Sequence, residues 1–314
     1  MLELFGAFYK SMSIKRQLKW QIRKLLVDHY PKLIIDHEWP HLFGHKIDWD
    51  HPRDLNEKIQ WLMCYSDTSQ WPQLADKYRV RGFVEERGLG SLLIKLYGVW
   101  ADARDIDYDT LPGRFVLKCN HDSGSTFLID KASGFNKEEL NAQINQRLRQ
   151  KFGYLNCEPY YNKIRPFVLA EEWIEDAKCD YSSTLVDYKL WAFDGRVECV
   201  WVYYDRTQDH VYTNVYDLDW NCHPECSVFD DYYQDGRGIV PRPQCLDEMI
   251  AAASTLSRGF PQVRVDFYEA NGKLYFGEMT LSGNKGRMLN KAQSHLNHLG
   301  EQVVLPAKRC PIKR

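Results

Sequence analysis

From residue 114 onward the chain consists mainly of short apolar or alternating runs, a pattern that predicts β-strands. The predicted strands cover 114–119, 126–130, 167–171, 188–193, 197–204, 263–268 and 273–279. Asp194-Gly195 and Asn271-Gly272 each separate two of these runs, and such dipeptides favour the tight turns of β-hairpins. Hairpins without regular alternation of strands and helices indicate an α+β fold.

Helical patterns dominate before residue 100. Segments 56–65 and 72–87 are predicted helices, and the second has Pro72 near its start and Gly88 directly after its end. We therefore expect a helical N-terminal region, a small lobe and a large lobe at 1–112, 113–172 and 173–314.

Two later helices and a long connection complete the predicted pattern. Asn136 followed by Glu139 forms a capping box for a helix that reaches about residue 151. Segment 246–258, which ends before Gly259, predicts a second helix. The region 205–243 is rich in Tyr, Asp, Cys and Pro, and we expect it to be a long loop near a functional site.

Residues 14–26 form an amphipathic helical pattern. Basic side chains cover one face, and the other face carries Ile14, Leu18, Ile22, Leu25 and Leu26. Two interpretations remain open: an edge helix that docks its apolar stripe on the core, which we favour, and a helix that contacts an anionic membrane surface.

Composition narrows the function classes. Among 314 residues, 41 Lys and Arg face 43 Asp and Glu, so no global basic field attracts nucleic acid, and we expect no nucleic-acid partner. Nine cysteines without a C-x-x-C pair favour free thiols in a reducing compartment. Because Met1 to Tyr9 does not resemble a signal peptide and no apolar run could span a bilayer, we expect a cytoplasmic protein, with peripheral attachment to the inner face of the membrane as the open alternative.

Two carboxylates lie on the last predicted hairpin. Asp266 is on its first strand and Glu278 on its second. Mg²⁺ prefers such hard oxygen ligands, usually one or two carboxylates together with phosphate oxygens and water. The sequence therefore predicts a magnesium site here, and the competing interpretation is that both side chains simply face solvent.

A lysine and a small polar loop supply candidate phosphate contacts upstream. Lys118 lies on a predicted strand that runs into residues 120–125, where small side chains let backbone N–H groups approach an anion. Both well-known glycine-rich phosphate loops, G-x-G-x-x-G and G-x-x-x-x-G-K-[ST], are absent from the sequence. On its own, the segment is more typical of a surface lysine before a hairpin turn than of a phosphate site.

Several segments in this order resemble the ATP-grasp ligases, most closely the TupA-like branch named for teichuronopeptide biosynthesis. The segments are LNEKIQW (55–61), ADKY (75–78), FVLKCNHDSG (115–124), AEE (170–172), DYK (187–189), RVDFY (264–268) and GE (277–278). The resemblance implies ATP and Mg²⁺ held between two α+β lobes.

The resemblance also implies residue roles. The implied phosphate ligands are Lys77, Lys118 and the loop residues His121, Ser123, Gly124 and Ser125. Adenine and ribose would lie at the segment Glu172, Trp173, Ile174 and Glu175. Metal would be held by Asp266 and Glu278, and Thr280 stands where the family usually has an asparagine, so the third ligand stays open. Cations for the transferred phosphate and the carboxylate substrate would be Lys189, Arg206 and Arg264.

The function implied is carboxylate–amine ligation. ATP would phosphorylate a carboxylate, an amine would attack the acyl phosphate, and an amide, ADP and phosphate would leave. The family suggests a uronic acid of a bacterial surface polysaccharide, either free or linked to a nucleotide or lipid, and an amino acid or small amine.

Other functions stay open at this stage. Asp217-Leu218-Asp219 matches the short D-x-D pattern of glycosyltransferases that use sugar nucleotides, and a noncatalytic nucleotide-binding partner is a third possibility. Residues Cys222, His223 and Cys226 carry zinc-type ligands, but no second cysteine pair lies at finger spacing, so we expect an ordinary loop.

Overall fold

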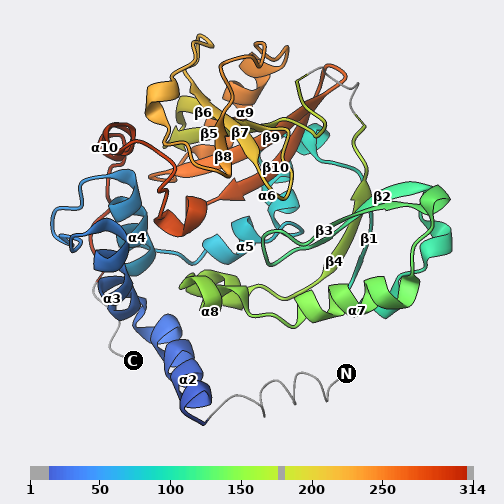
Figure 1. Cartoon of the computed structure of the whole chain (residues 1–314), viewed down its shortest axis with the longest axis horizontal. Coiled ribbons are helices and arrows are strands. Elements are labelled where there is room, and N and C mark those ends of the chain that lie inside the picture. The colour runs from blue at the N-terminus through green and yellow to red at the C-terminus, as the bar shows by residue number, and fades with distance from the viewer. Residues whose placement is uncertain (1–13, 176–180, 310–314) are drawn as a thin grey trace.

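The computed structural model describes residues 14–175 and 181–309. The first 13 residues, which include the Met1 to Tyr9 stretch, lie outside this part of the chain. Two β-sheets form the body of the protein, and helices from the N-terminal third and from the C-terminus pack beside them (Figure 1).

The smaller sheet has the strand order β1-β4-β2-β3 and is antiparallel throughout. Its strands are β1 (Leu96–Trp100), β2 (Arg114–Cys119), β3 (Thr126–Asp130) and β4 (Val168–Glu172). Helix α7 (Lys137–Leu148) packs its buried residues Leu140, Ile144 and Leu148 into the core of this lobe. Strand β1 lies before residue 113, where we expected the small lobe to begin, and it was not predicted from the sequence.

Helix α7 begins at the predicted cap. The Asn136 side chain accepts a hydrogen bond from the Glu139 backbone N–H at 3.0 Å. The helix ends at Leu148 rather than near residue 151, and a separate short helix follows, α8 (Phe152–Asn156).

The larger sheet has the order β10-β9-β5-β6-β7-β8. Its strands are β5 (Asp187–Phe193), β6 (Arg196–Tyr204), β7 (Val211–Tyr216), β8 (Tyr233–Asp235), β9 (Val263–Ala270) and β10 (Lys273–Thr280). Both residues of each predicted hairpin turn have positive φ, with Asp194 at 46° and Gly195 at 88° in the first. Helix α9 (Leu246–Ser257) packs on one face of β5, β6 and β9, which leaves the other face free to form a site.

The region 205–243 is not one long loop, so that part of the expectation was wrong. It contributes strand β7 and strand β8, which pair in parallel at the edge of the large sheet. Val211, Val215 and Tyr216 are buried, and this burial supplies the reason that the segment becomes a strand.

The described residues before β1, 14–95, are mostly helical. Their helices are α2 (Ile14–His29), α3 (Pro31–Phe43), α4 (Leu55–Tyr65), α5 (Trp71–Ala75) and α6 (Val80–Glu86). The C-terminal helix α10 (Gln293–Glu301) packs on α4. Short 3₁₀ turns link the elements: η1 (Gly90–Leu92), η2 (Ala103–Asp105), η3 (Tyr108–Thr110), η4 (Lys131–Ser133), η5 (Pro159–Lys163), η6 (Pro224–Cys226) and η7 (Gly283–Gly286).

The single helix predicted over 72–87 is broken, and a long-range contact explains the break. Between α5 and α6, Asp76 has an extended backbone, and its carboxylate accepts hydrogen bonds from the backbone N–H groups of Tyr78 and Arg79 and from the Asn120 side chain. These bonds replace helical ones and bring Lys77 beside the loop that follows β2, where the Lys77 N–H bonds the Asn120 carbonyl at 3.1 Å.

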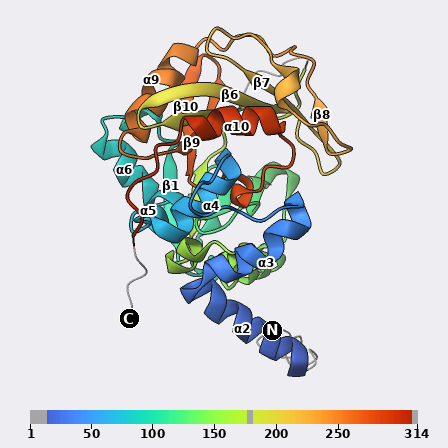
Figure 2. The same ribbon diagram turned by 90° about the vertical axis from the view of Figure 1, so that its left-hand side faces the viewer.

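Most of the described part of the apolar stripe on residues 14–26 does not dock on the core, so the favoured interpretation was wrong. Leu18, Ile22 and Leu25 are exposed, whereas Leu26 packs partly against the core. Helix α2 extends away from the two sheets in both views (Figures 1 and 2). Across residues 14–175 and 181–309, no helix is both long and apolar enough to cross a bilayer.

The Asn136 cap gives a test of the local argument. Replacement of Asn136 by Ala removes the acceptor for the Glu139 N–H and should lower the free energy of unfolding by about 1 kcal/mol. Asn136→Asp is the matched control, because its carboxylate accepts the same bond. Chemical denaturation measures both changes, and equal loss in the two variants would contradict a capping role.

Candidate active site

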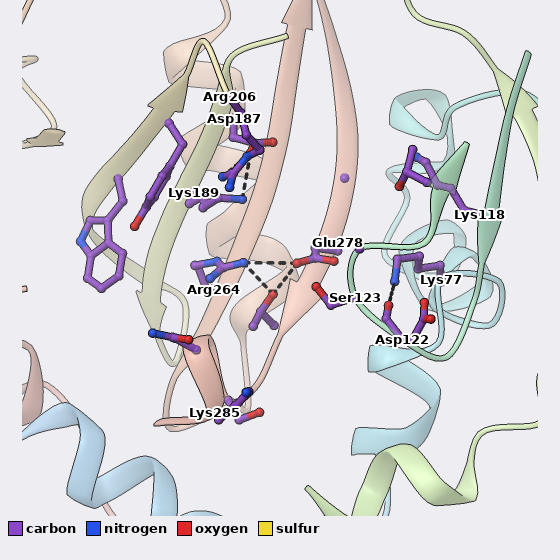
Figure 3. A pocket seen from close by; sticks show the side chains of 18 of the residues that line it. Lys77, Lys118, Asp122, Ser123, Asp187, Lys189, Arg206, Arg264, Glu278 and Lys285 are labelled. Carbon is purple, nitrogen blue, oxygen red and sulfur yellow. Dashed lines mark hydrogen bonds and ion pairs between the residues drawn. The ribbon is translucent and has the colours of Figure 1, made fainter. Parts of the chain in front are cut away.

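One cavity of about 510 Å³ lies between the two sheets. Figure 3 shows Lys77, Lys118, Asp122 and Ser123 on one side, and Lys189, Arg206 and Arg264 on the other. The basic residues in its lining are Lys77, Lys118, Lys189, Arg206, Arg264 and Lys285. Segments that are far apart in the sequence therefore converge on one space that is lined by six basic residues and five acidic ones, Asp122, Glu158, Glu171, Asp187 and Glu278.

Strand register builds the large-lobe wall of this cavity. Asp266 on β9 lies opposite Glu278 on β10 and opposite Lys189 on β5. Because side chains alternate along a strand, Arg264 shares the face of Asp266. A bulge between Phe276 and Glu278 adjusts the pairing, and a Cβ on Gly277 would lie 3.0 Å from the Asp266 carbonyl oxygen, so glycine suits this close approach.

A dense ion cluster occupies this face. The Arg264 guanidinium donates to both Asp266 oxygens at 2.6 and 2.7 Å, and Lys189 Nζ lies 2.6 Å from Asp266 Oδ2. Asp266 is only 2 % exposed and does not itself line the cavity, because its two cations cover it. Burial raises the pKa of the Asp266 carboxyl, but the charges of Arg264 and Lys189 outweigh burial and hold that pKa below its usual range.

The same cluster allows a test of the predicted magnesium site. One guanidinium nitrogen, Arg264 Nη2, lies 2.7 Å from Asp266 Oδ2, 3.2 Å from Glu278 Oε1 and 3.0 Å from Thr280 Oγ1. Three side-chain oxygens thus converge on one cationic atom, which stands in for a positive ion. The set is all oxygen with two carboxylates, and this chemistry fits Mg²⁺.

The small lobe supplies the opposite wall. Lys118 Nζ lies 2.9 Å from Glu171 Oε2, and Arg81 also approaches Glu171, at 3.5 Å. Lys77 donates to the Asp122 carbonyl, and Ser123 and Gly124 line the cavity in the loop between β2 and β3. Gly124 has φ of 84°, a conformation that suits glycine.

Two predicted loop residues point elsewhere. His121 is buried, and its Nε2 contacts the Gln150 carbonyl at 3.2 Å. Burial lowers the pKa of His121. Ser125 is also buried and donates to Asp122. Neither residue is among the described residues that line the cavity.

The predicted adenine segment lies beside the cavity rather than in its described lining. Glu172 donates its backbone N–H to the Lys95 carbonyl at 2.9 Å, and the ring of Trp173 stacks on the Arg114 guanidinium at 4.3 Å. Glu175 pairs with Arg114 and accepts a bond from Asn271. Of the acidic residues at this strand end, Glu171 is the one that lines the cavity; Glu172, Trp173, Ile174 and Glu175 do not.

Arg206 joins the site from the connection between β6 and β7. Its Nη2 lies 3.5 Å from Asp187 Oδ2, which also lies 3.5 Å from Lys189 Nζ. Tyr203 lies within 5.7 Å of both cations, measured to its ring centre.

Sequence reasoning missed several lining residues. Trp201, Tyr203 and Tyr233 form an aromatic wall, and Glu158, Ser282 and Lys285 line another part. The strand alternation of 197–204 could have placed Trp201 and Tyr203 on one face. Glu158 lies outside any strand and shows no such signal.

Glu158 is a buried carboxyl in this wall. It accepts hydrogen bonds from Ser282 and from the Tyr160 hydroxyl, the latter at 3.2 Å. Burial raises the pKa of Glu158 to about 7, although these bonds and the charges of Lys285 and Arg287 act in the opposite direction.

The alternative motifs lie outside the cavity. Asp217 accepts hydrogen bonds from Asn221, and both ring nitrogens of His223 are near carboxylates, Asp217 at 3.3 Å and Glu225 at 3.0 Å. Within residues 14–175 and 181–309, no group of three or more His, Cys, Asp or Glu side chains is arranged to hold a metal ion. The cysteine segment therefore gains no support as a zinc site, and neither Asp217 nor Asp219 is among the described residues that line the cavity.

Comparison with family models identifies the chain. Residues 57–304 match the model described as TupA-like ATPgrasp. The chain belongs to the TupA-like ATP-grasp family. The resemblance inferred from the sequence and the α+β fold are thus confirmed. No curated protein matches this TupA-like chain.

Several solved ligase structures resemble the chain distantly. D-alanine–D-alanine ligase from Bacillus anthracis complexed with ATP is 14% identical with a TM-score of 0.43, over 74% of this chain and 65% of that chain. L-amino acid ligase from Bacillus licheniformis is 13% identical with a TM-score of 0.42, over 72% and 48%. ATP-grasp ligase PsnB complexed with minimal precursor is 12% identical with a TM-score of 0.41, over 76% and 63%. The TupA-like chain therefore matches about half to two thirds of the length of each.

Glu158 yields a prediction on pH-dependent stability. Its pKa is about 7 in the folded protein and about 4.5 in an unfolded chain, so its contribution is complete below about 4.5 and is lost as the pH rises through 7. Between pH 4.5 and 8 the wild type should lose about 3 kcal/mol of unfolding free energy through ionisation of Glu158. Glu158→Gln cannot ionise at this position and should not show that loss. Denaturation curves across this range measure the difference. Exposed Glu86→Gln is the control, and a parallel pH dependence of wild type and Glu158→Gln would contradict the assignment.

Proposed function

We propose that the protein is an ATP-dependent carboxylate–amine ligase that forms an amide, ADP and phosphate. The observation that carries this proposal is the single cavity shared by Lys77 and Lys118 from the small-lobe side and by Arg264, Glu278 and Thr280 from the large lobe. Membership of the TupA-like ATP-grasp family supports the same class of reaction.

The small-lobe wall suits the phosphates of ATP. Lys77 and Lys118 supply ammonium groups, and the loop with Ser123 and Gly124 offers a backbone that can approach an anion closely. Adenine and ribose would then lie toward the strand end at Glu172 and Trp173. We place His121 and Ser125 behind this wall, where they hold the loop in shape rather than contact phosphate.

The large-lobe wall suits the metal and the reacting carboxylate. Asp266, Glu278 and Thr280 would hold Mg²⁺, which neutralises phosphate charge and aligns the triphosphate when bound. Arg264, Lys189 and Arg206 then remain to orient a substrate carboxylate and to stabilise the charge that develops on it.

These cations address the chemical difficulty of amide formation. A carboxylate is a resonance-stabilised anion without a good leaving group, and conversion to an acyl phosphate supplies one. The amine then attacks the acyl carbon, the C–O bond to phosphate breaks, and the amine proton leaves to solvent or to a nearby base. Exclusion of water between the two walls would protect the acyl phosphate from hydrolysis.

We further propose a uronic acid of a bacterial surface polysaccharide as the acid, and an amino acid or small amine as its partner. Support comes from the family and from the aromatic wall of Trp201, Tyr203 and Tyr233, which can face a sugar ring. We place the reaction in the cytoplasm, since the described cysteines are free thiols.

A coupled assay for ADP tests the reaction class. With Mg²⁺-ATP, a panel of uronic acids and a panel of amines, ADP should appear only when an acid is present, and hydroxylamine should trap a hydroxamate from the acyl phosphate. Hydrolysis of a sugar nucleotide without ATP consumption would favour a glycosyltransferase instead. Tight ATP binding without turnover on the whole panel would indicate a noncatalytic binding protein.

Two variants separate the two walls. Glu278→Gln weakens the oxygen set and should lower kcat at least 100-fold, with a thermal midpoint within about 2 °C of the wild type.

Lys118→Ala removes a phosphate contact and should raise the Kd for ATP about tenfold, equivalent to about 1.4 kcal/mol. Turnover and calorimetric titration measure these effects. Lys95→Ala, exposed and outside the cavity, is the control; normal kcat in Glu278→Gln would contradict the assigned metal wall.

A further inference from the structure

Helix α2 presents an apolar stripe to solvent. Leu18, Ile22 and Leu25 are 60%, 47% and 56% exposed, and their spacing of four and three residues places them on one face. Such a stripe normally faces the protein core, so its outward orientation needs an explanation.

The opposite face of α2 holds the helix to the protein. Arg23 donates to the Tyr154 carbonyl and to Glu38, both at 2.8 Å, and Val27 is fully buried. The Trp20 ring meets the Tyr154 ring edge-on at 6.4 Å. The orientation of α2 is therefore fixed by specific polar and aromatic contacts, and the stripe remains on the outer side.

Exposed apolar side chains concentrate around this helix. Within the described residues, six of the thirteen large hydrophobic side chains that are strongly exposed lie between residues 18 and 42; they are Leu18, Ile22, Leu25, Tyr30, Leu33 and Leu42. On α2 itself the exposed side chains of Leu18, Ile22 and Leu25 share one face, which distinguishes them from the scattered exposure that is ordinary on protein surfaces.

Charge identifies the class of surface that fits. Arg16 and Lys19 are exposed and Lys24 is half-buried, whereas Asp28 is the single acidic residue of α2. The fourth described basic residue, Arg23, is already neutralised by Glu38. The chain as a whole has a formal net charge of −2, so the positive charge is local to the helix.

We propose that α2 lies in the interface of an anionic lipid bilayer, with Leu18, Ile22 and Leu25 among the acyl chains and Arg16 and Lys19 at the headgroups. This arrangement is the usual one for interfacial amphipathic helices. A second copy of the chain fits less well, because two stripes in contact would bring two basic helices together. Three aliphatic residues also provide far less area than the roughly 800 Å² per partner of a stable dimer.

The attachment has a structural route to the cavity. Helix α2 is clamped to α8 through Tyr154 and Leu155, whose carbonyl groups accept bonds from Arg23. Phe152, the first residue of α8, lines the cavity. A helix docked on a bilayer would therefore hold the cavity close to the lipid surface.

Vesicle co-sedimentation of the full chain tests the proposal. We use vesicles of phosphatidylcholine alone and of phosphatidylcholine with 30% phosphatidylglycerol, in about 0.1 M salt. The wild type should sediment with the anionic vesicles and bind neutral ones at least tenfold more weakly. The double variant Leu18→Glu, Ile22→Glu should lose at least tenfold in affinity for anionic vesicles, and Lys19→Glu should lose part of it.

Matched controls keep the test specific. Leu128→Glu and Val304→Glu alter apolar residues on other parts of the surface that are similarly or more exposed, at 59% and 80%, and these variants should bind like the wild type. Thermal unfolding and nucleotide binding should be unchanged in all variants, so failure here is separate from failure of the proposed ligase function.

Three results would overturn the proposal. The first is no sedimentation of the wild type with anionic vesicles, and the second is equal binding of wild type and double variant. The third is a wild-type dimer in light scattering that the double variant converts to a monomer, because a second copy would then cover the stripe.

Discussion

The buried ion cluster around Asp266 is the interaction on which the rest of the site depends. A carboxylate that is almost fully withdrawn from water is costly unless it is paired, and here both its oxygens meet cations, Arg264 and Lys189. The charges on β5, β9 and β10 thereby fix one another across three strands. The cluster holds the large-lobe wall in one arrangement. Apolar side chains of similar volume would often stabilise the fold equally well, so the ion cluster is not explained by stability alone.

The scaffold produces this wall through elementary strand geometry. Alternation and antiparallel register put Asp187, Lys189, Arg264, Asp266 and Glu278 on the face that α9 does not cover. The small-lobe wall depends on a different device, a helix interrupted at Asp76 by long-range hydrogen bonds to the loop after β2. The alternation of side chains along each large-lobe strand follows from local pattern, whereas the pairing of β5 with β9 and the whole small-lobe wall require tertiary contacts.

This difference explains how far the sequence could predict the structure. The strands 114–119 and 126–130 match the observed β2 and β3, and both hairpin turns have the expected positive φ, because these features depend on neighbouring residues. The break at Asp76, the pairing of β7 with β8 and the outward stripe of α2 depend on distant partners that no local pattern encodes. The predicted site residues show the same difference. Lys118, Arg264 and Glu278 line the cavity, whereas His121 and Ser125 do not. Glu158 could not be predicted, because it joins the site only through the packing of its segment against Ser282.

The position of Arg264 has a consequence for the order of events. Its guanidinium sits where the oxygens of Asp266, Glu278 and Thr280 converge, so at the proposed magnesium site a free divalent ion would have to compete with a covalently attached cation. An ion bound to the triphosphate of ATP would bring phosphate oxygens with it, and the displaced Arg264 guanidinium could pair with these oxygens. The ligand-free protein would thus bind free Mg²⁺ weakly and bind the Mg²⁺–ATP complex better, so that the metal would enter the site together with the nucleotide.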